Sequence, residues 1–281
     1  MLRTVLLPID FSADSDLVLR FCTGLAELGT RRVVCCYVVD ATGLEGPVIA
    51  AKLDAARQRM RTATKPLADA GFDVEVRLPT GDPETELLAL ATENHIDAVV
   101  CGTSGKTLAD RMLSGSVSER LASSSGIPAL TVRYDLLRSV ADPAALAKGF
   151  GRMMLVPTDF SGTAARALNV ALSIPKKAVG TIRVLHVLPE ARDAGRAMQQ
   201  ETGAEFQLRN LVAIAKERGL SATPVIGHGV PERAILGEID DCGVSGVVIG
   251  SRGRTPLQEV LMGSVSMTLM RQAPCPVLIV P

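Results

Sequence analysis

Two glycine-rich stretches of this chain share one spacing. Gly102-Thr103-Ser104-Gly105 is followed by nine residues and then by Gly115-Ser116-Val117, and the same spacing joins Gly250-Ser251-Arg252-Gly253 to Gly263-Ser264-Val265. Glycines let the backbone approach a ligand that a Cβ atom would exclude. A Gly-Ser pair at the start of a helix offers N–H groups, a hydroxyl and the positive end of the helix dipole. Each stretch therefore predicts a cradle for phosphate.

The surroundings of the two stretches also match. An apolar run precedes each of them, residues 98–101 in the first case and residues 247–249 in the second, and a short helix is expected after each. A single Gly-x-x-Gly is more often a tight turn than a binding loop. Repetition at one spacing, after a strand and before a helix, favours a shared anion site.

The repetition extends along most of the chain. Pro157-Thr158-Asp159-Phe160-Ser161 restates Pro8-Ile9-Asp10-Phe11-Ser12, and Gly229-Val230-Pro231 restates Gly81-Asp82-Pro83. Asp159 follows Asp10 by 149 positions and Gly263 follows Gly115 by 148, so the copies differ by almost no insertion. The sequence therefore predicts a tandem duplication, with domains at residues 1–134 and 151–281 and a linker at 135–150.

Each copy alternates strands and helices. In the first copy, strands are expected at residues 4–9, 32–39, 73–78, 98–101 and 129–133, with a long helix at about 49–70. This alternation predicts an α/β fold: a doubly wound, flavodoxin-like or Rossmann-like parallel sheet with strand order 3-2-1-4-5. Ligands bind such sheets beyond the carboxyl ends of the strands, where Asp10, Asp159 and both glycine stretches are expected.

The composition excludes several classes of function. The 281 residues include 30 Lys plus Arg and 30 Asp plus Glu, which gives no general attraction to nucleic acid or to an anionic membrane. No apolar run approaches the roughly 20 residues of a membrane span, and the start of the chain does not read as a signal peptide. Six cysteines without a CxxC pair are expected to be buried thiols. The expected location is the cytoplasm.

Each half resembles the nucleotide-binding subclass of the universal stress protein family. The resemblance rests on the Gly-x2-Gly-x9-Gly-Ser loop, the aspartate after the first strand and the Gly-x-Pro before the third helix, all present in both halves. It implies a stress-response regulatory or signalling module that binds ATP, or else ADP, AMP or cyclic AMP. Mg²⁺ as a companion of ATP is compatible with this implication.

The resemblance also implies roles for individual residues. Asp10 and Asp159 would hold the adenine or ribose end, Val38 and Val187 would meet adenine with their backbone, and the loop glycines would wrap the phosphates. The implied nucleotide-binding residues are Pro8, Asp10, Val38, Cys101, Gly102, Gly105, Gly115, Ser116 and Val117 in the first half, and Pro157, Asp159, Val187, Ile249, Gly250, Gly253, Gly263, Ser264 and Val265 in the second.

Two alternatives to a binding module stay open. One is an enzyme, a weak ATPase or a nucleotidyl transferase, and the other is a scaffold with vestigial nucleotide sites. The sequence offers no Ser-His-Asp order, metal-ligand cluster or Walker B context, so no residue is assigned a catalytic role. His186 lies in an expected strand and is interpreted as a packed core histidine.

The resemblance further implies how the halves associate. Single-domain relatives pair their last strands, so residues 128–133 and 276–280 are expected to pair within one chain as an intramolecular pseudo-dimer. Such pairing would close two exposed sheet edges. A homodimer of the whole chain and a regulatory protein partner stay open.

Overall fold

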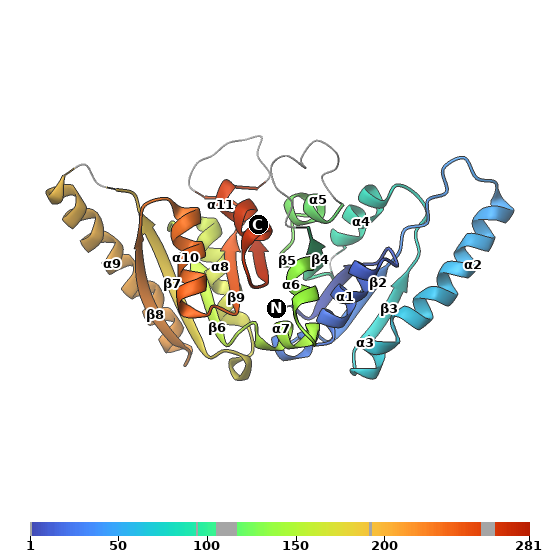
Figure 1. Cartoon of the computed structure of the whole chain (residues 1–281), viewed down its shortest axis with the longest axis horizontal. Helices are drawn as coiled ribbons and strands as arrows, with labels where there is room; N and C mark the ends of the chain where they lie inside the picture. The colour runs from blue at the N-terminus through green and yellow to red at the C-terminus, as the bar shows by residue number, and fades with distance from the viewer. Residues whose placement is uncertain (1, 94, 105–116, 191–192, 254–261) are drawn as a thin grey trace. The chain divides into compact units, whose positions relative to one another are not determined.

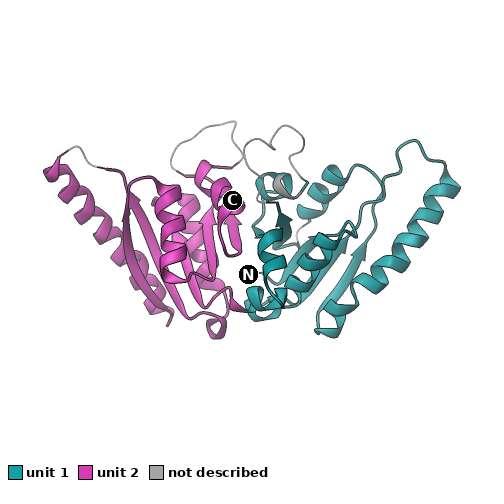
Figure 2. Cartoon of the chain, viewed as in Figure 1, with its two compact units in different colours: residues 1–148 teal, residues 149–281 magenta. Residues whose placement is uncertain are grey.

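The chain divides into two compact units. The computed structural model describes residues 2–93, 95–104, 117–190, 193–253 and 262–281. The units comprise Met1–Lys148 and Gly149–Pro281 (Figure 2). Each unit contains strands and helices in alternation, as the repeat predicts.

The strands of unit 1 form a parallel sheet in the order β3-β2-β1-β4-β5. They are β1 (Thr4–Pro8), β2 (Arg32–Cys36), β3 (Asp73–Arg77), β4 (Ala98–Thr103) and β5 (Ala129–Arg133). The predicted order 3-2-1-4-5 is therefore confirmed. The winding reverses between β1 and β4, and their carboxyl ends are where a ligand is expected.

Helices cover both faces of this sheet (Figure 1). They are α1 (Ala13–Cys22), the 3-10 turn Leu25–Leu28, α2 (Gly46–Ala63), α3 (Lys65–Asp69), α4 (Pro83–Ala91) and α5 (Val117–Ser124). Right-handed crossovers place α1, α2 and α3 on one face and α4 and α5 on the other. The contacts of α1 with α3 and of α4 with α5 agree with this arrangement.

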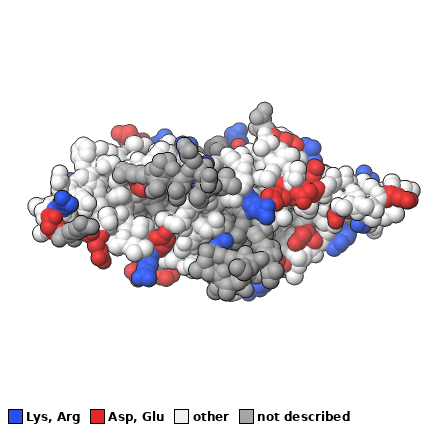
Figure 3. Space-filling view, turned by 90° about the horizontal axis from the view of Figure 1, so that it is seen from above, with Lys and Arg blue, Asp and Glu red and all other residues white. Residues whose placement is uncertain are grey.

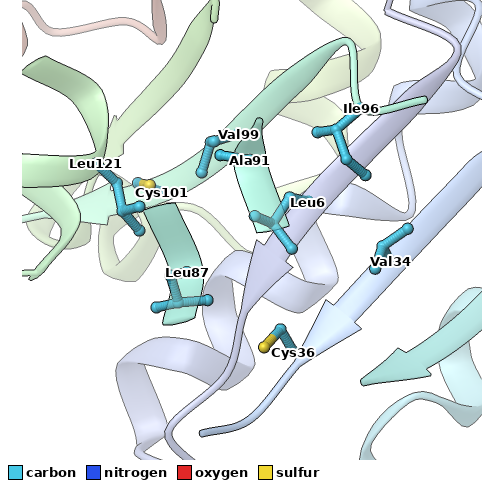
Figure 4. Packing of buried hydrophobic residues seen from close by; sticks show 9 residues of the cluster. All are labelled: Leu6, Val34, Cys36, Leu87, Ala91, Ile96, Val99, Cys101 and Leu121. Atoms are coloured by element: carbon cyan, nitrogen blue, oxygen red, sulfur yellow. The ribbon is translucent and has the colours of Figure 1, made fainter. Parts of the chain in front are cut away.

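Apolar side chains from the sheet and from one helical layer form the core on the α4–α5 face. Figure 4 shows the cluster, to which β1, β2, β4, α4 and α5 all contribute. Its members are Leu6, Val34, Cys36, Leu87, Ala91, Ile96, Val99, Cys101 and Leu121. The central strands lack polar alternation because both faces of a parallel sheet are buried.

Unit 2 repeats the winding, with strand order β10-β9-β6-β7-β8. Its strands are β6 (Met153–Pro157), β7 (Thr181–Leu188), β8 (Ser221–His228), β9 (Gly246–Gly250) and β10 (Val277–Val280). Its helices are α8 (Gly162–Ser173), the 3-10 turn Lys176–Ala178, α9 (Ala194–Glu217), α10 (Pro231–Cys242) and α11 (Ser264–Gln272). The two units are therefore built on the same frame.

The second strand and the long helix of unit 1 differ in extent from the prediction. The second strand, expected to reach Val39, ends at Cys36, and Val39 makes only an isolated bridge to Thr80. The long helix expected at 49–70 begins at Gly46 and is divided at Thr64 into α2 and α3. Pro66 lacks an N–H and its ring crowds the preceding turn, which explains the break.

The segment predicted as a linker is packed. It contains α6 (Tyr134–Ser139) and α7 (Pro143–Gly149), and α6 contacts α1. The side chains of Leu137 and Ala147 are fully buried. Residues 135–150 are thus mostly helical, while the domain boundaries at 134 and 151 stay a prediction.

Charged side chains of both signs are interspersed on the face seen in Figure 3, in line with the equal numbers of acidic and basic residues. Of the helices within the described ranges, none combines the length and the apolar character needed to cross a bilayer.

Candidate functional site

A strained turn follows β6 in unit 2. Phe160 adopts a φ of 63°, a left-handed conformation that costs a bulky residue about 1–3 kcal/mol. Hydrogen bonds hold the turn, among them those from Ser161 N–H to Asp159 Oδ1 at 3.0 Å and from Ala164 N–H to Ser161 Oγ at 3.2 Å. The second bond caps α8. The turn therefore fixes the Asp159 carboxylate just beyond the end of β6.

His186, near the end of β7, packs on this turn. Its Nδ1 lies 2.7 Å from the carbonyl oxygen of Thr158, and its ring centroid lies 4.4 Å from that of Phe160. A carbonyl only accepts hydrogen bonds, so Nδ1 carries the proton and Nε2 accepts in the neutral ring. The sequence interpretation of His186 as a packed residue is incomplete, because the side chain is only half-buried and lines the pocket.

The first two loop glycines allow close approaches within the protein itself. A Cβ atom on Gly250 would lie 3.0 Å from the carbonyl carbon of Thr163, at the start of α8. A Cβ atom on Gly253 would lie 2.8 Å from Asp159 Oδ2. The glycines thus bring the loop after β9 against the start of α8 and against the carboxylate of Asp159.

The start of α11 forms the other side of the site. Gly263 is the N-cap, and its own N–H donates to Ser251 O at 2.8 Å. The hydrogen-bond ladder of α11 begins where Met267 N–H donates to Gly263 O at 3.0 Å. The N–H groups of Ser264 and Val265 come before this bond in the chain and are not part of the ladder. N–H groups at a helix start, together with the dipole, favour an anion.

These elements enclose a pocket of about 680 Å³, within the range of small-molecule sites. All nine residues predicted for the second half line it: Pro157, Asp159, Val187, Ile249, Gly250, Gly253, Gly263, Ser264 and Val265. The walls also include Leu185, Ile235 and Met262, which are apolar, and the charged side chain of Arg252. The pocket therefore combines apolar surface with a polar end at the helix start.

Unit 1 repeats the strained turn after its first strand. Phe11 has a φ of 61°, and Ser12 N–H donates to Asp10 Oδ1 at 2.8 Å. Tyr37 occupies the position of His186, with its ring centroid 4.6 Å from that of Phe11. Asp10 is exposed and Pro8 half-buried. The turn, the carboxylate and the aromatic pair are thus features of both copies.

The other predicted residues of unit 1 are only partly described. Cys101 is 3% exposed within the core cluster, and Val38 and Val117 pack against the same cluster. A Cβ atom on Gly102 would lie 2.0 Å from a ring carbon of Tyr134, so this glycine accommodates an aromatic ring from α6. The remaining predicted residues, Gly105, Gly115 and Ser116, lie outside the described residues.

The model of the universal stress protein family matches residues 1–133 and 152–281. The chain belongs to the universal stress protein family. The two matches coincide with the two copies predicted from the repeat, and the doubly wound α/β fold is that of the family.

Individual relatives support this assignment. Universal stress protein YxiE of Bacillus subtilis (strain 168) is 33% identical over 144 residues, which cover 45% of this chain and 97% of the relative. Universal stress protein Rv2005c of Mycobacterium tuberculosis (strain ATCC 25618 / H37Rv) is 26% identical over 220 residues, or 75% of this chain and 70% of the relative. The crystal structure of a universal stress protein from Archaeoglobus fulgidus DSM 4304 matches with a TM-score of 0.77 and 25% identity, covering 99% of this chain and 95% of that chain.

Across the ranges that the structure describes, no three His, Cys, Asp or Glu side chains are grouped so as to hold a metal ion. Within this pocket, Asp159, His186 and Arg252 are the titratable side chains of the lining. The arrangement supports ligand binding by charge and shape, and we assign no catalytic residue.

Proposed function

We propose that this universal stress protein binds an adenine nucleotide and acts as a regulatory or signalling module in the stress response. The observation that carries the proposal is the convergence of all nine predicted residues of the second half on one pocket of about 680 Å³. The apolar walls suit a purine base, and the start of α11 suits phosphate.

The proposed roles follow the positions of the residues. Asp159 binds the ribose or adenine end, the backbone of Val187 meets the base, and the loop glycines with Ser264 and Val265 receive the phosphates. In unit 1, Asp10, Val38 and the loop that follows Cys101 take the same roles. The ligand is ATP, ADP, AMP or cyclic AMP, and ATP brings Mg²⁺ with it.

The proposal also covers assembly and location. The last strands of the two units pair within one chain as a pseudo-dimer, which removes two sheet edges. A regulatory protein recognises the nucleotide-bound chain in the cytoplasm. The equal numbers of acidic and basic residues agree with a small-molecule ligand in preference to nucleic acid.

The direct experiment measures bound ligand. The purified chain is denatured, the released nucleotide is identified by mass spectrometry, and its amount per chain is determined. Calorimetric titration with ATP, ADP, AMP and cyclic AMP then gives the affinities. Absence of released nucleotide, together with no heat of binding at millimolar ligand, would refute the proposal.

A substitution at Gly263 tests the pocket itself. A Cβ atom at this position meets its closest neighbour, Ser251 O, at 3.5 Å, which is ordinary contact, and the backbone conformation suits any residue. Gly263→Leu is therefore expected to fold normally and to obstruct the pocket that Gly263 lines. The bound nucleotide should fall from two per chain to one.

The matched control for this variant is Gly237→Ala. Gly237 lies within α10 and has open space around it, and it is not part of the pocket lining. Its stoichiometry should equal that of the unmodified chain. Unchanged stoichiometry in Gly263→Leu as well would mean that the loop is purely structural.

A further inference from the structure

The hydroxyl of Ser264 already has a partner. Ser264 Oγ donates a hydrogen bond to Glu232 Oε1 at 2.8 Å. Glu232 belongs to the first turn of α10, and α10 packs against α11. A carboxylate thus lies beside the helix start that the proposed function assigns to phosphate. A hydroxyl has one proton, so Ser264 cannot donate to Glu232 and to a phosphate at the same time.

The equivalent carboxylate of unit 1 is neutralised. Glu84 precedes Glu232 by 148 positions, the offset of the glycine loops, and it pairs with Arg120 Nη1 at 2.8 and 3.1 Å. The residue 148 positions after Arg120 is Thr268, which carries no charge. The two units therefore differ in charge at corresponding positions.

We propose that Glu232 is a specificity-determining residue that lowers the affinity of the unit 2 pocket for a phosphate group seated on Ser264. This inference rests on the proposed function. A phosphate within hydrogen-bond distance of Ser264 lies about 6 Å or less from the Glu232 carboxylate. Like charges at that separation near a protein surface repel strongly enough to lower affinity about tenfold.

The charged side chains that the structure describes in the pocket lining are Asp159 and Arg252. Asp159 adds a second negative charge to the lining, and Arg252 adds one positive charge. With Glu232 included, acidic groups outnumber basic ones around the described part of the site. The unit 2 pocket thus selects ligands with fewer phosphate charges near α11, whereas in unit 1 Arg120 cancels the corresponding charge.

The test compares adenine ligands that differ only in the number of their phosphate groups, from none to three. Calorimetry in EDTA measures adenosine, AMP, ADP and ATP binding to the unmodified full chain and to Glu232→Gln. The glutamine keeps an oxygen that accepts from Ser264 and removes the charge. We expect Glu232→Gln to tighten binding of at least one phosphorylated ligand about tenfold, with adenosine affinity unchanged within twofold.

Glu217→Gln controls for net charge. Glu217 is exposed at the end of α9 and is not part of the pocket lining, so its removal should leave all four affinities unchanged. Thermal unfolding of each variant confirms that the fold is intact. The unit 1 site is the same in every variant, so the differences belong to unit 2.

Two results would overturn the inference. Unchanged phosphate affinity in Glu232→Gln would show that the carboxylate has no effect at the site, and weaker binding would show that it positions the Ser264 hydroxyl for the ligand. These outcomes differ from failure of the proposed function, in which the unmodified chain binds none of the four ligands.

Discussion

Phe11 and Phe160 show how single residues shape the two sites. Each is a bulky residue at positive φ, a conformation maintained only where the surroundings require it. The surroundings are equivalent in the two units: an aspartate accepts a hydrogen bond across the turn, and an aromatic ring packs on the phenylalanine. Recurrence of the same strained turn in both copies indicates that it serves the placement of Asp10 and Asp159.

The buried thiols make stability depend on pH. Burial raises the pKa of Cys101 from the ordinary 9.0 to about 12. The unfolded chain loses this proton above pH 9, while the folded chain keeps it. The free energy of unfolding is therefore highest below pH 9 and falls as the pH rises from 9 to 12. Because of Cys101, the free energy of unfolding is expected to be about 1.4 kcal/mol lower at pH 10 than at pH 8.

Urea unfolding of Cys101→Ala measures this cost. The variant should lose about 1.4 kcal/mol less than the unmodified chain between pH 8 and pH 10, whatever its stability at pH 8. Cys242→Ala is the comparison at a half-buried thiol, whose pKa is also raised, by desolvation and by its hydrogen bond to Glu238. Equal pH dependence in the unmodified chain and in Cys101→Ala would contradict the assignment.

The sequence identified some residues that line the candidate pocket and missed others for a physical reason. Glycine spacing, the aspartate after the strand and the Gly-Ser helix start are local patterns, and all nine residues so identified in the second half line one pocket. His186 and Glu232 were missed because their importance depends on partners 28 and 32 positions away. His186 and Tyr37 occupy the same position of the repeat, and both carry an aromatic ring. This recurrence was the sequence signal that could have identified His186.

At the scale of elements, strand order was predictable and helix extent was not. Alternating strands and helices allow few right-handed windings, so the order 3-2-1-4-5 followed from the pattern. The division of the long helix at Thr64 and the helices α6 and α7 depend on tertiary packing. Alanine-rich sequence after residue 140 fits a linker or a packed helix equally well until its contacts are known.

Gly24 tests the packing of α7. A Cβ atom on Gly24 would lie 2.3 Å from the carbonyl oxygen of Ala144 and 2.9 Å from the Cβ of Ala147. Its backbone conformation suits any residue, with φ at −85°, so the penalty comes from the clash alone. Gly24→Ala is expected to destabilise unit 1 by about 1–3 kcal/mol in urea unfolding.

Gly237→Ala makes the same chemical change, but it is expected to stabilise the protein. Gly237 lies within α10 and its Cβ atom would meet open space, so alanine should stabilise unit 2 by about 0.5–1 kcal/mol. If Gly24→Ala is as stable as the unmodified chain, α7 can move away from the added methyl group without loss of stability. The 135–150 segment would then be a loose connection.

At the scale of the whole molecule, duplication raises the question of what the last strands do. In the order of each unit, β5 and β10 stand at one end, and β3 and β8 stand at the other. An end strand without a neighbour leaves alternate N–H groups unpaired, which exposes them to exchange and to aggregation. The proposed pairing of β5 with β10 would satisfy both strands within one chain.

Hydrogen exchange followed residue by residue tests this pairing. If β5 and β10 pair, all of their amides should exchange as slowly as those of β1 and β6, the interior strands of the two orders. In β3 and β8, alternate amides should exchange faster, which provides the comparison within the same sample. Fast exchange of alternate amides in β5 and β10 would exclude the pseudo-dimer. Protection that disappears on dilution would place the pairing between chains, because an intramolecular contact does not depend on concentration.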